Sequence, residues 1–426
     1  MAAAAKAPRP SMRILFFTEN FPPEMNAAAT RVFERACYWV KWGHDVTIVT
    51  CHPNFPQGRL FDGHDNRWHT TETMAGMRVV RVKTYISANT GVAKRILDFT
   101  SFMATGYVAS LFEHRPDVIV STSPQFFCAV AGWASSTSRR VPFVFELGDL
   151  WPASIVAVGA MKQSIALRGV EQLELFLYRQ SAAVVALTRS FKDDLVGRRI
   201  DPDKIAVVIN GVDLPRYAPR PRDAELASRW GLEGKFVVGY IGTHGSAHGL
   251  HNVLEAAERT RDDDRLRYMF VGTGAERQAL ELAASERRLD NIVFIPPQPK
   301  ESMPRFWSLC DVALIHLKDD PVFQTVIPSK MFEAMGMGLP LLLSAPVGEA
   351  SRIVEDDGAG LCVPAGAPDA LADAALQLMS DAALHRRLCE QSHAAASKHT
   401  RERQAQEMID VLGQVVAAGP VPTALR

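Results

Sequence analysis

Lys330 and Glu333 lie three residues apart in a segment that the sequence predicts to be a helix, Lys330–Met337. Ser329 precedes this run of good helix formers, so we expect it to be the N-cap. The helix dipole disfavours a cation in the first turn, whereas a phosphate bound there would be held by free N–H groups and by the lysine. Glu333, one turn deeper, could accept hydrogen bonds from both hydroxyls of a ribose. The alternative is that both residues are ordinary solvated helix charges.

Two glycine-containing loops follow predicted strands in the second half of the chain and are the next candidates for phosphate contact. Glycines at a strand-to-helix turn let the backbone approach a phosphate closely, and histidines in the first loop could bond phosphate oxygens. The alternative is a tight turn with solvated histidines. The candidate nucleotide-binding residues in the two loops are Gly242, Thr243, His244, His248, Gly272 and Gly274.

Acidic, amide, basic and aromatic side chains follow two predicted strands in the first half. An aspartate next to a tryptophan is typical of a sugar platform, in which an aromatic face lies beside a hydroxyl acceptor. The alternative is a buried tryptophan with a capping aspartate. The candidates for contact with a second substrate are Glu24, Asn26, Arg31, Asp149 and Trp151.

The elements that must position these side chains are short apolar runs separated by helical periods. The runs are continuous rather than alternating, as parallel strands buried on both faces require. This alternation predicts an α/β protein with two doubly wound, Rossmann-like domains that face each other across a cleft, which is the expected ligand site. The predicted strands are Arg13–Phe17, Val46–Thr50, Arg78–Val82, Val118–Ser121, Phe143–Glu146, Val184–Leu187, Ile205–Ile209, Phe236–Ile241, Tyr268–Val271, Ile292–Ile295, Val312–His316, Leu341–Ser344 and Leu361–Val363.

We expect a disordered tail over residues 1–11, an N-terminal domain over residues 12–210 and a C-terminal domain over residues 211–398. The hinge is predicted at Gly211–Leu232, which is rich in proline and charge and has no strong periodicity. Apolar positions in Thr400–Val416 fall on one helical stripe, so we expect a last helix over residues 399–418.

The composition excludes disordered and fibrous classes, because the 426 residues are 47% hydrophobic and 22% charged. The 47 Lys and Arg residues balance the 47 Asp and Glu residues. The balance hides an asymmetry, since residues 1–200 carry a net charge of +7 and residues 201–426 one of −7. Two halves of opposite charge indicate a division of labour between them. We expect no nucleic-acid partner.

Other sequence signals point to a cytoplasmic protein without a metal. The six cysteines show no CxxC spacing, and most lie in apolar surroundings, which is typical of reduced core residues. HExxH, GxSxG and zinc-type spacings do not occur, so we expect no metal and no cofactor other than a co-substrate. The tail has no apolar signal region, and no run of 18 apolar residues occurs. The apolar segment Lys94–Phe112 could lie on a membrane surface, or equally form a core helix.

With these residues the chain resembles the retaining family-4 glycosyltransferases of the GT-B fold, from Met12 to about Val416. The resemblance rests on the order and spacing of short motifs. They are Phe21-Pro-Pro-Glu24, Gly43-His-Asp-Val46, Ser123-Pro124, Asp149-Leu-Trp-Pro152, Asn210-Gly-Val-Asp213, Gly272-Thr-Gly274, Pro328-Ser-Lys330 and Glu333-Ala-Met335. The resemblance implies a nucleotide-sugar donor on the C-terminal domain, an acceptor on the N-terminal domain, and a last helix that crosses back to the N-terminal domain. The segments Asn26-Ala-Ala-Ala29 and Gly242-Thr-His-Gly245 are similar to the corresponding loops of bacterial polysaccharide and O-antigen transferases, including enzymes that move N-acetyl-L-fucosamine from UDP.

Two positions depart from the family pattern. The family's two glutamates are separated by seven residues, and here Glu333 fits the second position while Thr325 stands at the first. The usual arginine and lysine of the diphosphate loop are missing, and His248 stands near the place of the lysine. The donor-binding set implied by the resemblance therefore adds Thr325, Ser329, Lys330 and Glu333 to the loop residues.

The resemblance implies transfer of a sugar from a UDP-sugar to a glycan acceptor on a polyprenyl diphosphate. Lys330 and the loop amides would stabilise the leaving diphosphate, Glu333 would hold the ribose and Asp149 would orient the acceptor, so these three residues are the catalytic candidates. The basic first half would suit an anionic membrane surface at the inner face of the cytoplasmic membrane. Two alternatives stay open: a UDP-sugar epimerase of the same architecture, and a non-catalytic nucleotide-sugar-binding protein.

Overall fold

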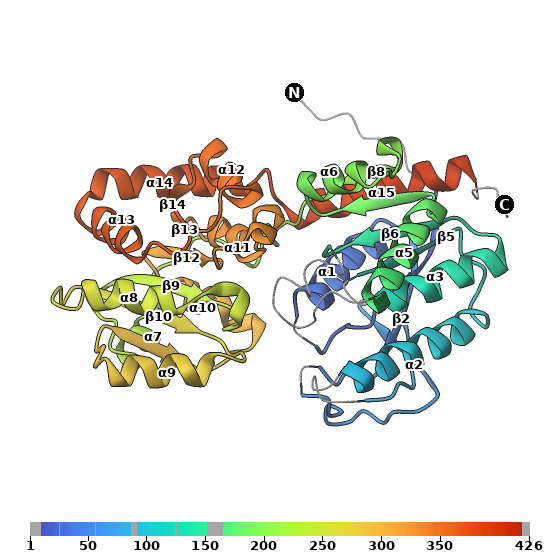
Figure 1. Cartoon of the computed structure of the whole chain (residues 1–426), viewed down its shortest axis with the longest axis horizontal. Coiled ribbons are helices and arrows are strands. Elements are labelled where there is room, and N and C mark those ends of the chain that lie inside the picture. The colour runs from blue at the N-terminus through green and yellow to red at the C-terminus, as the bar shows by residue number, and fades with distance from the viewer. Residues whose placement is uncertain are drawn as a thin grey trace.

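The computed structural model describes residues 10–24, 26–55, 57–86, 92–123, 126–150 and 165–419. These residues form two halves, each built on a sheet covered by helices on both faces (Figure 1). The predicted architecture, two Rossmann-like α/β domains, is therefore confirmed. The expected tail falls mainly on residues 1–9, which lie outside the described residues.

The first half contains an eight-stranded sheet in the order β3-β4-β2-β1-β5-β6-β7-β8. Its strands are β1 (Arg13–Phe17), β2 (Asp45–Cys51), β3 (His69–Met74), β4 (Met77–Val82), β5 (Val118–Thr122), β6 (Phe143–Leu147), β7 (Ala183–Ala186) and β8 (Ile205–Val207). Its helices are α1 (Ala27–Lys41), α2 (Val92–Ser110), α3 (Phe126–Arg139), α5 (Ile165–Gln180) and α6 (Arg189–Gly197). All neighbouring strands are parallel except β3 and β4.

The second half contains a six-stranded parallel sheet in the order β11-β10-β9-β12-β13-β14. Its strands are β9 (Phe236–Ile241), β10 (Leu266–Val271), β11 (Ile292–Ile295), β12 (Val312–His316), β13 (Leu341–Ser344) and β14 (Gly360–Val363). Its helices are α7 (Ala224–Arg229), α8 (His251–Arg259), α9 (Arg277–Glu286), α10 (Met303–Trp307), α11 (Lys330–Gly336), α12 (Glu349–Asp356), α13 (Pro368–Ser380) and α14 (Ala382–Ala396).

Each sheet is buried on both faces, which explains why its strands are uninterrupted apolar runs. In β1, Leu15 and Phe17 pack on one side of the sheet, and Ile14 and Phe16 pack on the other. The strands of the second sheet divide between two cores in the same way. Burial of alternate side chains on opposite faces requires every position in the strand to be apolar.

Strand β3 was not predicted, because it is a polar edge strand and most of its side chains are exposed. It pairs antiparallel with β4 through a tight turn at Ala75 and Gly76, whose φ angles are +49° and +80°. Two successive residues with positive φ favour the right-handed twist of a hairpin. The turn at Ala75 and Gly76 was therefore the feature of the sequence that could have indicated this hairpin, because β3 has no apolar pattern.

The last helix, α15 (Arg401–Ala418), leaves the second half and packs on the first, as Figure 1 shows. Ala405, Met408, Ile409 and Leu412 are buried in the core that also contains residues of β1 and α1. The indole N–H of Trp39 in α1 donates to the carbonyl oxygen of Ala405 at 2.9 Å. The expected crossing helix is therefore present, and it ties the end of the chain to the first sheet.

The two chain segments that connect the halves are hydrogen-bonded to each other. The Val212 N–H donates to the His399 carbonyl oxygen at 2.9 Å, and the Arg401 N–H donates to the Val212 carbonyl oxygen at 2.8 Å. A Cβ atom on Gly211 would lie 2.5 Å from the Thr400 carbonyl, so a glycine is required where the segments approach. The predicted hinge, Gly211–Leu232, is also more ordered than its sequence indicated, because α7 lies within it.

Along the parts of the chain that the structure describes, no helix is both long and apolar enough to cross a membrane. Helix α2 is a core helix on one side, where Phe102 and Ala109 are buried, and exposes Leu97 and Val108 on the other. The segment Lys94–Phe112 therefore packs on the core through one side, and its other side stays available for a membrane surface. All six cysteines are free thiols.

Candidate functional site

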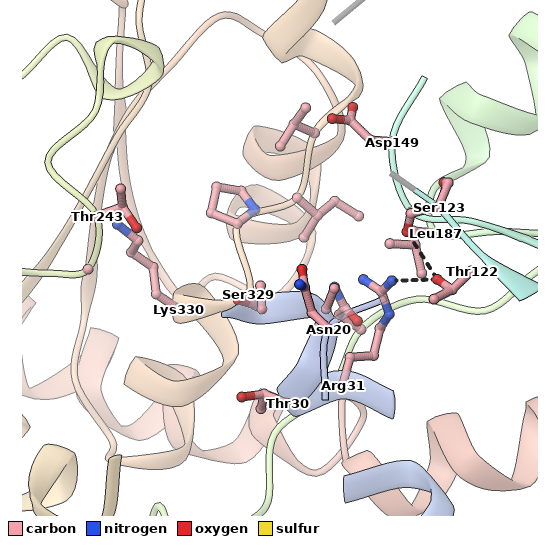
Figure 2. Close-up of a pocket in the computed structure, with 18 of the residues that line it drawn as sticks. Asn20, Thr30, Arg31, Thr122, Ser123, Asp149, Leu187, Thr243, Ser329 and Lys330 are labelled. Carbon is pink, nitrogen blue, oxygen red and sulfur yellow. Dashed lines mark hydrogen bonds between the residues drawn. The ribbon is translucent and has the colours of Figure 1, made fainter. Parts of the chain in front are cut away.

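A cavity of about 830 Å³ lies between the two halves and is lined by both. In each sheet it opens where the strand order reverses, between β1 and β5 in the first half and between β9 and β12 in the second. Loops at the carboxyl ends of parallel strands diverge at such switch points and leave a crevice for a ligand. Side chains from the first half and the second half approach from opposite sides (Figure 2).

Lys330, the first residue of α11, is the buried cation on the second-half side of the cavity. Its Nζ atom is buried without a hydrogen-bond partner among the described residues and lies 3.7 Å from the centroid of the Tyr240 ring. A Cβ atom on Gly242 would lie 2.8 Å from Nζ, so the glycine makes room for the ammonium group. Burial lowers the pKa of Lys330 to about 7. It is therefore not an ordinary solvated helix charge.

Two histidines brace each other beside Lys330. His316 donates from Nδ1 to the His248 carbonyl oxygen at 2.6 Å, and Nδ1 of His248 lies 3.4 Å from the His316 carbonyl oxygen. Burial and the nearby Lys330 lower the pKa of His248 to about 3, and burial lowers that of His316 to about 4. His248 lines the cavity as a neutral imidazole, so it does not replace the family lysine as a cation. His316 was missed because it lies at the end of an apolar strand.

Three predicted loop residues support the cavity wall from behind and do not line it. His244 is fully buried, with its ring between Tyr240 and Phe270. A Cβ atom on Gly272 would lie 2.1 Å from the Gly242 carbonyl oxygen, and one on Gly274 would lie 2.3 Å from the His244 carbonyl oxygen. The second glycine loop therefore packs directly against the first, which places Gly242 and Thr243 at the cavity.

The remaining residues predicted for the second half line the cavity. Burial raises the pKa of Glu333, whose Oε2 accepts a hydrogen bond from the Trp307 indole at 3.4 Å. Thr325 donates from its hydroxyl to the Val322 carbonyl oxygen at 2.8 Å. Ser329 is the N-cap of α11, as predicted, although its side chain makes no capping hydrogen bond.

On the first-half side the cavity contains the guanidinium group of Arg31, which comes from α1. Its Nη2 atom donates to the Thr122 hydroxyl at 3.2 Å, and its Nε atom lies 3.5 Å from Oε1 of Glu146. Glu146 is also bound by Arg35 through two hydrogen bonds of 2.6 and 2.9 Å. Burial alone would raise the pKa of Glu146, but Arg35 and Arg31 lower it to about 2.

Glu24 and Asn26 are structural residues that do not line the cavity. Oε1 of Glu24 accepts the backbone N–H groups of Asn54 and Phe55 at 2.7 and 2.8 Å and so holds a loop that does reach the cavity. Asn26 is the N-cap of α1, and its side-chain oxygen accepts the Ala29 N–H at 2.9 Å. Both residues lie near the start of α1, as predicted. Their side chains hold the backbone instead of facing the cavity.

Asp149 lines the cavity near Ser123 and Leu187 (Figure 2). Its neighbour in the predicted sugar platform, Trp151, lies outside the described residues. The carboxylate predicted to accept a sugar hydroxyl is therefore at the cavity, and its role stays a prediction.

The structure also adds charged residues that no local motif indicated. Glu34 binds three cations from the second half, the linker and α15, namely Lys300 at 2.6 Å, Arg216 at 3.1 Å and Arg401 at 3.0 Å. At the first-half end of the cavity, burial raises the pKa of Asp98 to about 7. Among the described residues no group of three or more His, Cys, Asp or Glu side chains could hold a metal ion.

Two protein families match the chain, one for each half. Residues 26–211 match the glycosyl transferase 4-like domain, and residues 224–395 match the glycosyl transferases group 1. The boundary between the two matches falls in the linker that connects the two sheets.

Individual relatives agree with the family matches. WcaI of Escherichia coli (strain K12), which is assigned to colanic acid biosynthesis as a glycosyl transferase, is 24% identical over 84% of this chain and 90% of its own length. The sucrose-phosphate synthase of Thermosynechococcus elongatus superposes with a TM-score of 0.77 at 17% identity, covering 96% of this chain and all of that one. Anabaena HepE in complex with UDP and glucose superposes with a TM-score of 0.72 at 17% identity, covering 95% and 100%.

Proposed function

Because the chain belongs to the GT-B glycosyltransferases, with its two family matches spanning most of its length, we propose that it transfers a sugar from a UDP-sugar to a glycan acceptor. The acceptor is linked to a lipid diphosphate and the product enters a bacterial surface polysaccharide. WcaI supports the polysaccharide, and the UDP in the HepE complex supports the nucleotide. The N-acetylated deoxyhexose implied by the loop sequences is the proposed sugar.

The observation that carries this proposal is the buried ammonium group of Lys330. A lysine without an anion at a buried position is costly, and its cost falls when a negative ligand arrives. Lys330 is the first residue of α11, and Gly242 and Thr243 add a backbone wall beside it. These are the features of a diphosphate site. The neighbouring Glu333 would then lie within reach of the ribose hydroxyls.

The proposed reaction breaks the bond between the anomeric carbon and the diphosphate oxygen and forms a bond from that carbon to an acceptor hydroxyl oxygen. Negative charge develops on the diphosphate, and Lys330 and the loop amides stabilise it by about 3 kcal/mol per donor. The acceptor attacks from the face that the diphosphate leaves, so the configuration is retained. The acceptor proton passes to the departing diphosphate, while Asp149 orients the acceptor hydroxyl. The reaction needs no metal and no cofactor.

A transfer assay distinguishes this function from its alternatives. UDP-sugars that carry a radiolabel in the sugar are incubated with the protein and a polyprenyl-diphosphate glycan. Label that moves into the lipid fraction is the expected result. Label that changes its sugar identity without acceptor would indicate a UDP-sugar epimerase, and label that stays in unchanged UDP-sugar would indicate a non-catalytic binding protein.

Two substitutions test the roles of the second-half residues. Lys330→Ala is expected to lower kcat by two to three orders of magnitude, about the effect of removing one oxyanion donor, because it removes charge stabilisation in the transition state. Glu333→Ala is expected mainly to raise the KM for the donor, because a ribose contact acts equally in the ground state and the transition state. Equal and mild effects of both changes would contradict this assignment.

We also propose that the protein works at the cytoplasmic face of an anionic membrane, because the acceptor is lipid-linked. The supporting observation is an exposed apolar surface along α2 and just after it. Large apolar side chains in water are typical of membrane or protein contact when they gather on one face. The surface consists of Ile96, Leu97, Val108, Leu111 and Phe112.

Sedimentation with vesicles tests the membrane contact. The wild-type protein is expected to sediment with phosphatidylglycerol vesicles and much less with phosphatidylcholine vesicles. Leu97→Ser combined with Phe112→Ser is expected to weaken this binding several-fold, whereas Leu282→Ser, at another exposed leucine, on α9, leaves it unchanged. Wild-type protein that stays in the supernatant with both vesicles would overturn the membrane proposal.

A further inference from the structure

The first half holds two buried arginines and one carboxylate in mutual contact, and one of the arginines, Arg31, lines the cavity. Arg35 takes both oxygens of Glu146, at 2.6 and 2.9 Å, so this pair is already complete. Arg31 shares the same carboxylate at the longer distance of 3.5 Å. The other charged groups that act on Arg31 are Arg35 and Arg401, and both are cations. One positive charge is therefore left over, and it resides at Arg31.

The hydrogen-bonding capacity of Arg31 is also unused. A guanidinium group carries five N–H donors, and the structure gives Arg31 one hydrogen bond, from Nη2 to Thr122. Its Nε atom is buried, with only 7% of the side chain exposed, and makes no hydrogen bond among the described residues, since Oε1 of Glu146 lies 3.5 Å away. A buried donor that makes no hydrogen bond destabilises the unliganded site. The site is thus incomplete until a ligand supplies acceptor oxygens.

The backbone around Arg31 leaves space for the guanidinium group. A Cβ atom on Gly148 would lie 2.9 Å from Nη2 of Arg31 and 2.6 Å from the Ser123 carbonyl oxygen. The glycine lets the arginine lie at the end of β6, beside the switch point of the first sheet. In Figure 2, Arg31 lies on the side of the cavity opposite Lys330, with Asn20 and Ser329 between them.

We propose, on the basis of the transferase function above, that Arg31 is a second anion-binding group of the cleft and takes phosphate oxygens from the side opposite Lys330. A guanidinium group offers two parallel N–H donors, which match two oxygens of one phosphate. The phosphate belongs to the diphosphate of the donor or to that of the lipid-linked acceptor, and both sources share this chemistry. Arg31 would then help to hold the two substrates across the cleft.

Calorimetric titration with two probes tests this proposal. The first probe is UDP, and the second is inorganic pyrophosphate added to protein already saturated with UDP. The variants are Arg31→Gln, which removes the charge, and Arg31→Lys, which keeps the charge but removes the fork. Arg78→Gln is the matched control, because Arg78, on β4, pairs with Glu113 away from the cavity. Thermal melts establish that each variant is folded. If Arg31→Gln does not fold, the comparison of Arg31→Lys with the wild type tests the proposal.

An at least tenfold weaker affinity for UDP in Arg31→Gln, with Arg31→Lys between it and the wild type, supports the proposal with the donor as the source. Unchanged UDP affinity with loss of pyrophosphate binding supports it with the acceptor as the source. Unchanged binding of both probes in both Arg31 variants overturns it. Wild-type protein that fails to bind UDP overturns the proposed function instead, and the pyrophosphate titration then decides the role of Arg31 alone.

Discussion

In the unliganded protein the positive charge of Lys330 is opposed by burial and favoured by the nearby Glu333. Its ammonium group is buried over the Tyr240 ring, and the nearby imidazoles of His248 and His316 are neutral, with pKa values lowered to about 3 and 4. Glu333, three residues further on the same helix, favours the charged form, but burial outweighs it. The residue is thus poised to gain a proton when an anion binds.

The affinity for UDP should therefore depend on pH. Burial lowers the pKa of the free Lys330 to about 7 from the usual 10.5, and a bound diphosphate raises it again, so binding takes up a proton. Above pH 7 the dissociation constant should rise by about tenfold per pH unit up to pH 9. UDP itself is already ionised there, since phosphate titrates near pH 6, at about the value known for phosphorylated residues.

Calorimetry between pH 7 and pH 9 checks this dependence, and the same titrations in two buffers of different ionisation enthalpy count the protons taken up. Lys330→Gln is the matched control, and its weaker binding should not change with pH. A wild-type affinity that stays constant over this range would contradict the buried ammonium as the diphosphate ligand.

Site residues could be predicted where a local sequence pattern identified them. They could not be predicted where only the tertiary fold brings them to the site. Lys330 and Glu333 could be found because a cation at a helix start needs an explanation. Glu34 and His316 could not, because their partners lie more than 60 residues away along the chain. His244 was predicted to contact a ligand, but its ring packs into the core instead.

At the scale of elements, the cavity wall is a stack of two loops rather than one. The loop after β10 packs on the loop after β9, where His244 donates its N–H to the Thr273 carbonyl oxygen at 2.9 Å. The glycines of the outer loop are needed for this close approach of two backbones, and not for contact with the ligand. The ligand loop is thus held in place by the neighbouring loop.

Gly274→Ala should therefore damage the donor site from behind. Its Cβ would meet the His244 carbonyl oxygen at 2.3 Å, so the two loops must move apart. We expect UDP binding at least tenfold weaker and a melting temperature lower by several degrees, as for strain of about 1–3 kcal/mol. Gly245→Ala is the control, because its nearest contact would be a methyl group at 3.7 Å. Normal UDP binding by Gly274→Ala would contradict the supporting role of this loop.

The element pattern was predictable wherever burial on both faces forces a continuous apolar run. All thirteen predicted strands are present, with ends shifted by up to two residues. The missed strand, β3, is exposed at an edge, so its composition reflects solvent rather than the sheet. The missed helix α7 is only six residues long, too short to show a helical period.

At the scale of the whole molecule, the two halves are joined by paired backbone and by charge. The linker and the start of α15 are hydrogen-bonded at Val212. Close by, Glu34 on the first half binds Lys300, Arg216 and Arg401, and its side chain is only 10% exposed. Burial alone would raise the pKa of Glu34, but these cations lower it. One carboxylate thus holds the second half, the linker and the crossing helix to α1.

Glu34→Gln should loosen the arrangement of the two halves without disrupting either core. Removing one partner from buried ion pairs typically costs about 3–5 kcal/mol, and we expect a melting temperature lower by several degrees. Small-angle X-ray scattering should show a larger radius of gyration. Glu407→Gln is the control, since Glu407 makes one exposed pair with Arg403 in α15. An unchanged melting temperature and an unchanged scattering profile for Glu34→Gln would show that the halves are held by other contacts.

The most direct test of the central claim is a crystal structure of the protein with UDP. We expect the diphosphate to lie against the start of α11, with its oxygens in hydrogen-bond contact with Nζ of Lys330 and the backbone N–H of Thr243, and the ribose hydroxyls at the Glu333 carboxylate. UDP bound elsewhere, or bound in the cleft with its diphosphate away from Lys330, would contradict the account.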